Sequence, residues 1–284
     1  MIQSVTASLL ALLLASGAAL AQTATEAPTA DAPKADASKS EVPAAATPKK
    51  PPEFEPEVGQ AGKDVIWVPT PQTTVDRMLD MASAKPGDYV IDLGSGDGRT
   101  VIAAAKRGIR AFGVEYNPDM VELSRRNAER EGATKLATFV QGDIFKTDFS
   151  KATVLTMYLL PRLNMRLRPT ILKMKPGTRV VSHSFHMEDW QPDDGFNNDS
   201  GNCKEFCLAY FWVVPARVEG PWRIRQGALN LTQKFQTFTG TFKTRGKTHK
   251  IEDGRVRGEA ISFTAGGVKY QGTVKGRRMS VKAG

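Results

Sequence analysis

The segment Tyr89–Gly98, which reads YVIDLGSGDG, decides the fold of this chain. Its first five residues form a short apolar run of the kind that makes a buried parallel strand. Glycines then recur at alternate positions, where the missing Cβ atom allows a sharp turn and close approach of a ligand. Residues 100–106 read as a helix, whose first turn offers unpaired backbone N–H groups. A strand, a glycine turn and a helix in this order predict the ligand-binding unit of an α/β sheet.

The same alternation of elements continues on both sides of this segment. Apolar runs typical of strands recur at residues 111–114, 137–140, 154–159, 179–182 and 208–214. Amphipathic stretches typical of helices lie at residues 75–82, 120–130 and 163–172. Short elements that alternate in this way favour a doubly wound, Rossmann-like α/β sheet.

Residues 229–284 have a different pattern. Apolar and polar residues alternate around Tyr270, and glycine pairs such as Gly266-Gly267 mark turns, so we expect a small C-terminal antiparallel β module. This segment holds 12 Lys or Arg and 3 Asp or Glu, which accounts for the whole formal net charge of +9. The charge is either a solvated surface or a contact for an acidic polymer or a membrane surface. We expect no sequence-specific binding of nucleic acid.

Carboxylates follow successive predicted strands. Asp92 precedes the first glycine, Glu115 ends the second strand, and Asp143 with Ile144 follows the third. The carboxyl ends of parallel strands meet at one edge of the sheet, so these residues are expected to share a ligand site. There Glu115 can accept from ribose hydroxyls, Asp143 can accept from an adenine amino group, and Ile144 can pack on the ring. A carboxylate at Asp92 suits the cationic S-adenosylmethionine better than a pyrophosphate, and the glycine spacing differs from G-x-G-x-x-G.

These motifs resemble those of class I S-adenosylmethionine-dependent methyltransferases, over about residues 64–216. Within that class the chain is similar to the group that includes bacterial Dot1-like methyltransferases and the ATP synthase c-subunit lysine methyltransferase. The resemblance is carried by VPTP at 68–71, LGSGDGR at 93–99, EYNP at 115–118, GD at 142–143 and YLLP at 158–161.

The resemblance implies S-adenosylmethionine as the cofactor and N-methylation of a protein lysine as the activity, with a small-molecule acceptor as the alternative. It implies that the glycine turn and Asp92 hold the methionine part, Glu115 the ribose and Asp143 the adenine. Residues 65–71 would form part of a lid or substrate channel. The cofactor residues expected on this basis are Asp92, Gly94, Ser95, Gly96, Gly98, Glu115, Asn117, Asp143 and Ile144.

Tyr158 is the candidate catalytic residue, because it follows the fourth predicted strand, where acceptor and methyl group are expected to meet. The alternative is a packed aromatic side chain. His183 and His186 either orient the substrate or are solvated loop residues, and Trp190 either covers the core or stacks on substrate. A lysine nucleophile must lose its proton, which an apolar channel favours, so no specific base is required.

Cys203 and Cys207 are the two cysteines of the chain. They either form a local disulfide, remain free thiols, or join the upstream histidines around a metal ion. We expect no metal site, because the region offers few further ligands.

The first 21 residues are predicted to be a secretory signal peptide. The apolar run Leu9–Leu14 is followed by Ala19-Leu20-Ala21, a pattern typical of cleavage before Gln22. The run is short for a membrane span. Residues 22–62 lack apolar periodicity and predict a disordered linker. The expected order is a signal peptide at 1–21, a linker at 22–62, a methyltransferase domain at 63–228 and the β module at 229–284.

A signal peptide places the protein in the periplasm, with a cytoplasmic or membrane-anchored location as the alternative. Export conflicts with a cofactor that is made in the cytoplasm. The sequence is therefore also compatible with a second hypothesis: an exported, non-catalytic binding protein that has the methyltransferase fold and binds an acidic polymer through its β module. A third hypothesis, a nucleotide-dependent oxidoreductase, is disfavoured by the glycine spacing.

Overall fold

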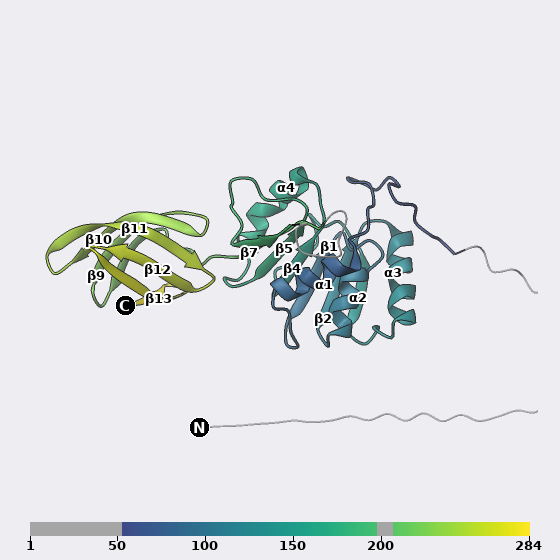
Figure 1. Ribbon diagram of the computed structural model, residues 1–284, viewed down its shortest axis with the longest axis horizontal. Helices are drawn as coiled ribbons and strands as arrows, with labels where there is room; N and C mark the ends of the chain where they lie inside the picture. Colours follow the sequence, from purple (N-terminus) through teal and green to yellow (C-terminus); the bar gives the residue numbers. More distant parts are fainter. Residues whose placement is uncertain (1–52, 198–206) are drawn as a thin grey trace, which may run out of the picture. The chain divides into compact units, whose positions relative to one another are not determined.

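The computed structural model describes residues 53–197 and 207–284 (Figure 1). The predicted signal peptide, most of the predicted linker and Cys203 lie outside the described residues. Cys207 is buried and disulfide-bonded, which agrees with the disulfide alternative. No helix in the described ranges is both long and apolar enough to cross a membrane.

The first sheet has seven strands in the order β3-β2-β1-β4-β5-β7-β6. Strands β1 to β5 pair in parallel, whereas β7 is antiparallel to both β5 and β6. This arrangement confirms the predicted doubly wound sheet. The strands are β1 (Tyr89–Leu93), β2 (Arg110–Glu115), β3 (Ala137–Gln141), β4 (Val154–Met157), β5 (Arg179–His183), β6 (Asp194–Phe196) and β7 (Ala209–Val213).

Helices pack on both faces of this sheet. Side chains of each strand alternate between the two faces, and apolar side chains on both faces need to be covered. Val90 of β1 packs in one core with Leu79 and Val101. Its neighbour Ile91 packs in a second core with Leu167. The helices are α1 (Gln72–Met81), α2 (Arg99–Lys106), α3 (Pro118–Arg130) and α4 (Pro161–Ile171).

The second sheet is a seven-stranded antiparallel meander in the order β14-β13-β12-β11-β10-β9-β8. Its strands are β8 (Gly220–Ile224), β9 (Gly227–Lys234), β10 (Thr237–Thr244), β11 (Lys247–Arg257), β12 (Ala260–Ala265), β13 (Val268–Lys275) and β14 (Arg278–Ala283). The inner face forms a separate core. The predicted β module is confirmed, but it begins before residue 229, because β8 pairs with β9 and Trp222 packs on that core.

Residues 53–62, which the sequence assigns to a disordered linker, are packed against the rest of the chain. Gly59 N donates to Trp67 O, and Trp67 N donates to Gln60 O. Farther back, an Nη atom of Arg126 donates to Phe54 O. The linker prediction is wrong for these residues because their backbone groups find partners later in the chain. We call residues 59–71 the strap.

Candidate active site

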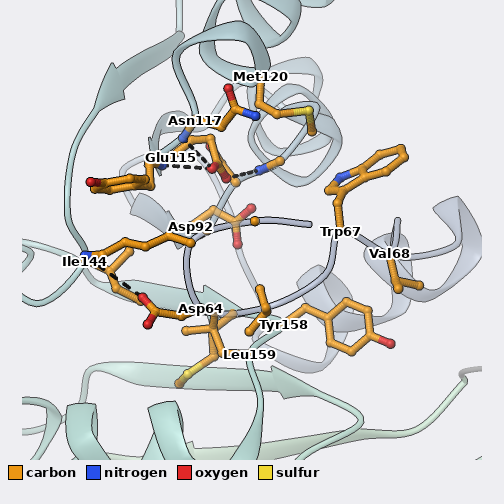
Figure 2. A pocket seen from close by; sticks show the side chains of 18 of the residues that line it. Asp64, Trp67, Val68, Asp92, Glu115, Asn117, Met120, Ile144, Tyr158 and Leu159 are labelled. Carbon is orange, nitrogen blue, oxygen red and sulfur yellow. Dashed lines mark hydrogen bonds and ion pairs between the residues drawn. The ribbon is translucent and has the colours of Figure 1, made fainter. Parts of the chain in front are cut away.

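A cavity of about 290 Å³ lies at the carboxyl ends of the central parallel strands, with the strap on one side. Figure 2 shows Asp92 in its middle, between Glu115 and Tyr158, with Trp67 and Val68 of the strap alongside. The predicted site residues that line the cavity are Asp92, Gly94, Ser95, Gly96, Glu115, Asn117, Asp143, Ile144 and Tyr158.

Gly98 is the one predicted site residue that the cavity lining does not include. Its φ of 84° lies in the left-handed region, and a Cβ atom there would lie 2.8 Å from the ring of Phe139. Gly96, with a φ of 55°, faces the strap instead, where a Cβ atom would lie 2.8 Å from Trp67 Nε1. Gly98 therefore allows close packing between α2 and β3, whereas Gly96 lets the strap approach the turn.

Asp92 places a carboxylate on the cavity floor, where it is 6% exposed. Burial raises its pKa to about 7, and the nearby Glu115 carboxylate adds to this effect. Hydrogen bonds from Thr156 and Thr100 oppose the rise, and Thr156 Oγ1 lies 2.7 Å from Asp92 Oδ1. A buried carboxyl of this kind ionises most readily when a cation binds beside it.

Glu115 joins the glycine turn to the end of β2. Its Oε2 atom accepts from Gly96 N at 3.0 Å, and its Oε1 atom accepts from Tyr116 N at 2.8 Å and Asn117 N at 3.0 Å. Asn117 in turn caps α3, because its side chain accepts from Asp119 N. Dashed lines in Figure 2 mark the bonds to Glu115. Glu115 thus orders this side of the cavity through backbone donors, with lone pairs left for a ligand hydroxyl.

Each carboxylate oxygen of Asp143 accepts a hydrogen bond. Its Oδ1 atom accepts from Phe145 N at 2.9 Å, and its Oδ2 atom accepts from Lys63 Nζ at 2.8 Å. The hydrogen bond from Lys63 lowers the pKa of Asp143. The same ammonium lies 4.4 Å from the centre of the Tyr116 ring. Sequence reasoning missed Lys63, since a single lysine in a polar segment carries no signal.

Tyr158 lies in an aromatic corner of the cavity. The centre of its ring is 4.0 Å from that of His183 and 6.2 Å from that of Phe185. Desolvation raises the pKa of Tyr158 above its usual value, and a hydrogen bond with Ser184 offsets only part of this rise. The hydroxyl therefore stays protonated at neutral pH. The sequence did not single out Phe185, which completes this wall.

His183 is the last residue of β5 and is fully buried, so the solvated-loop interpretation is wrong for it. Its Nδ1 atom lies 3.0 Å from Thr70 Oγ1, which ties the strap to β5. His186 is exposed, and the edge of its ring contacts Tyr210. Trp190 is buried and stacks on Phe235, so it belongs to the core and not to a substrate surface.

The residues of this cavity fit S-adenosylmethionine. The hydroxyl of Ser95 is buried and has no hydrogen-bond partner among the described residues, and it lies against Gly113 of β2, where a Cβ atom would be 2.6 Å away. Gly94 has a φ of 77°, and a Cβ atom there would lie 3.2 Å from Leu159, so glycine suits the turn on both grounds. Asp92 lies between this turn and the aromatic corner, where it can face the cationic part of the cofactor.

Comparison with known proteins agrees with this geometry. Residues 92–194 match the model of the ANTKMT methyltransferase domain. The chain is 43% identical to a protein-lysine N-methyltransferase of Saccharolobus islandicus, over 53% of this chain and 94% of that protein. It is 37% identical to the ATP synthase c-subunit lysine N-methyltransferase of Xenopus laevis, over 52% of this chain and 66% of that protein.

One solved structure is similar to this chain in both sequence and fold. The crystal structure of an RNA methyltransferase from Salinibacter ruber, in complex with S-adenosyl-L-homocysteine, is 44% identical and has a TM-score of 0.50. The alignment covers 53% of this chain and 96% of that one.

The parallel sheet, the glycine turn and the carboxylates at successive strand ends define a class I S-adenosylmethionine-dependent methyltransferase. Within that class, the chain belongs to the family of the Saccharolobus protein-lysine N-methyltransferase. S-adenosylmethionine is its cofactor.

Proposed function

We propose that this protein transfers a methyl group to the side-chain amine of a lysine in a protein acceptor. The observation that carries the proposal is the apolar end of the cavity next to Asp92. Its lining there includes Val68 and the aromatic corner of Tyr158 and Phe185. The lysine methyltransferases among the relatives support the same acceptor class.

An apolar wall suits a lysine because it disfavours the ammonium form and so promotes the neutral amine, which is the nucleophile. The bound cofactor supplies the electrophilic methyl group. Tyr158 remains protonated, so it positions the acceptor and does not remove its proton. Asp92 and Glu115 hold the cofactor in position, and the strap excludes water from the cavity.

The proposal can be tested with cofactor that carries a labelled methyl group. The protein is incubated separately with a soluble protein extract, a membrane extract and total RNA, and label is followed through protease and nuclease treatment. We expect protease-sensitive label that mass spectrometry places on lysine, and none with the Asp92→Ala variant. RNA is included because of the Salinibacter relative. Label confined to RNA, or cofactor binding without any transfer, would contradict lysine methylation.

For location, we propose export directed by residues 1–21, on the strength of the Ala19-Leu20-Ala21 pattern. Amino-terminal sequencing of the mature chain tests this, with Gln22 as the expected first residue. An uncleaved chain that stays in the cytoplasmic fraction would contradict export. We also propose that the basic β module contacts an acidic surface, because the net charge of the chain is concentrated there.

A further inference from the structure

The two ends of the antiparallel β module differ in their surroundings. In a meander, successive turns lie at alternate ends of the sheet. The turns at residues 224–227, 244–247 and 265–268 therefore share one end, and those at 234–237, 257–260 and 275–278 share the other. We call the first end the distal rim.

The opposite end contacts the methyltransferase core. Gly258, in the 257–260 turn, lies against that core, because a Cβ atom there would be 3.1 Å from Gly177 Cα and 3.5 Å from Val213 Cγ1. Gln236 Nε2 donates to Gln191 O at 2.7 Å, in the 234–237 turn. The distal rim lies at the far ends of the same strands and makes none of these contacts.

The distal rim is one connected surface. Thr244 Oγ1 donates to Gln226 O at 2.7 Å, which joins the 244–247 and 224–227 turns. Gln226 Nε2 donates in turn to Val281 O at 2.6 Å, which joins these turns to β14. Arg223 and Lys243 both face Ala228 in the strand register, so their side chains extend from neighbouring positions of the sheet.

Basic side chains surround this rim. The exposed ones are Arg223, Arg225, Lys243, Arg245, Lys247, Lys269 and Lys282. The segments 220–251 and 260–284 that build the rim contain no Asp or Glu. Within the part of the chain that the structure describes, none of these side chains is in an ion pair. At the opposite end, by contrast, Arg255 lies 2.7 Å from Asp193, and Lys234 and Lys275 also have acidic partners.

The apolar and aromatic residues near the rim indicate whether nucleic acid or an anionic lipid bilayer is the better partner for it. Val268, at the tip of the 265–268 turn, is 39% exposed. Three aromatic side chains lie nearest the rim. Phe242 and Tyr270 are buried in the core of the module. Trp222 is partly buried, packs on that core and donates its Nε1 to Val218 O at 2.7 Å, so none of the three is a fully exposed platform for stacked bases. An exposed valine among lysines and arginines suits the interface of an anionic bilayer.

We propose that the distal rim of the β module binds anionic phospholipid membranes. The rim would place its arginines and lysines at the headgroups and Val268 at the boundary with the acyl chains. This inference narrows the acidic surface proposed above to a lipid bilayer. It is independent of the methyl acceptor, because the rim lies outside the cavity.

The test is co-sedimentation of the purified protein with vesicles. One set contains phosphatidylcholine alone, and the other contains phosphatidylcholine with phosphatidylglycerol. The test variant carries Lys243→Gln, Arg245→Gln and Lys247→Gln in the β10–β11 turn. The matched control carries Lys275→Gln, Arg277→Gln and Arg278→Gln in the β13–β14 turn, which gives the same change in charge at the opposite end.

We expect salt-sensitive binding to the anionic vesicles alone. The test variant should lower the partition coefficient on the order of a hundredfold, since each basic side chain near such a surface contributes several-fold. The control should lower it much less. Binding of cofactor should be unchanged in both variants, which separates this result from failure of the proposed methyl transfer.

Three outcomes would overturn the proposal. They are equal losses in the two variants, equal binding to uncharged vesicles, and displacement of the protein from vesicles by duplex DNA together with tighter binding to that DNA. The last result would identify nucleic acid as the partner of the rim.

Discussion

The ammonium nitrogen of Lys63 lies 2.8 Å from the Oδ2 atom of Asp143 and joins the strap to the loop that follows β3. These residues stand 80 positions apart in the chain. The bond crosses the side of the cavity where Asp143 and Ile144 are expected to hold adenine. Lys63 is therefore placed to keep the strap closed over a bound cofactor.

Replacing Lys63 with methionine should speed release of S-adenosylhomocysteine by about two- to fivefold, the size of effect that a partly exposed ion pair can have. Stopped-flow displacement measures this rate. Lys63→Arg should retain slow release, and Lys135→Met, at an exposed position, serves as the control. A slower release from Lys63→Met would mean that the lysine competes with adenine and does not hold the strap.

The buried carboxyl of Asp92 should make cofactor binding depend on pH. Its pKa is about 7 in the folded protein, so below pH 7 a proton must leave before the carboxylate can face a cation. Affinity for S-adenosylmethionine should fall by up to about tenfold per pH unit below 7. Isothermal titration from pH 5.5 to 8 tests this, with Asp92→Asn as a variant that binds weakly and without this dependence.

The same pKa shift predicts how Asp92 affects stability. Because the pKa is raised from the usual value of about 4, the folded state binds more protons than the unfolded state between pH 4 and 7. The contribution of Asp92 to stability therefore falls as pH rises through this window. Asp92→Asn should raise the Tm of the ligand-free protein at pH 8 and leave it nearly unchanged at pH 4. A lower Tm at pH 8 would contradict the predicted cost of the buried charge.

Glu115→Gln should weaken both the fold and the site, because a carboxamide replaces one of the two oxygens that accept backbone N–H groups. We expect a loss of about 1.5–3 kcal/mol in the free energy of unfolding, typical of hydrogen bonds to a charged group. Urea denaturation measures it. Glu122→Gln on the exposed side of α3 should be neutral, and equal effects of the two changes would rule out this role of Glu115.

Gly96→Ala separates backbone strain from contact with the strap. Gly132 has a similar positive φ, 64° against 55°, but a Cβ atom there meets nothing within 4 Å. Both changes to alanine should cost about 1–2 kcal/mol of stability through the left-handed backbone. Only Gly96→Ala should also weaken S-adenosylhomocysteine binding, because it displaces Trp67. Equal affinities of the two variants would show that Trp67 is not needed at the turn.

Tyr158 should act through its ring more than through its hydroxyl. Tyr158→Phe keeps the packing on His183 and Phe185, and should lower kcat by less than about tenfold, in line with one hydrogen bond. Tyr158→Ala opens the aromatic corner and should lower kcat about a hundredfold, because the acceptor is then misplaced. A larger loss from the phenylalanine variant would give the hydroxyl a direct role.

Much of the fold and of the candidate site could be predicted from the sequence because the information is local. The apolar run of β1 and the glycines at 94, 96 and 98 fix a strand and a turn within one short segment. Asp92, Glu115 and Asp143 end or follow strands, so a parallel sheet brings them to the same edge. The period-two pattern near Tyr270 likewise indicated the β module without knowledge of its packing.

The rest depended on pairs of residues far apart in the chain. His183 and Thr70 are 113 positions apart, and neither has a local pattern that predicts the contact between them. The strap is ordered by such contacts, which is why residues 53–62 read as a linker from composition alone. The separate roles of Gly96 and Gly98 also follow from what lies opposite each one. By itself the sequence determined the class of fold, and it predicted that Asp92, Glu115 and Asp143 meet at one edge of the sheet, through periodicity and spacing along the chain. Only the tertiary structure decided what closes the cavity and which end of the β module is free, because those depend on packing between distant segments.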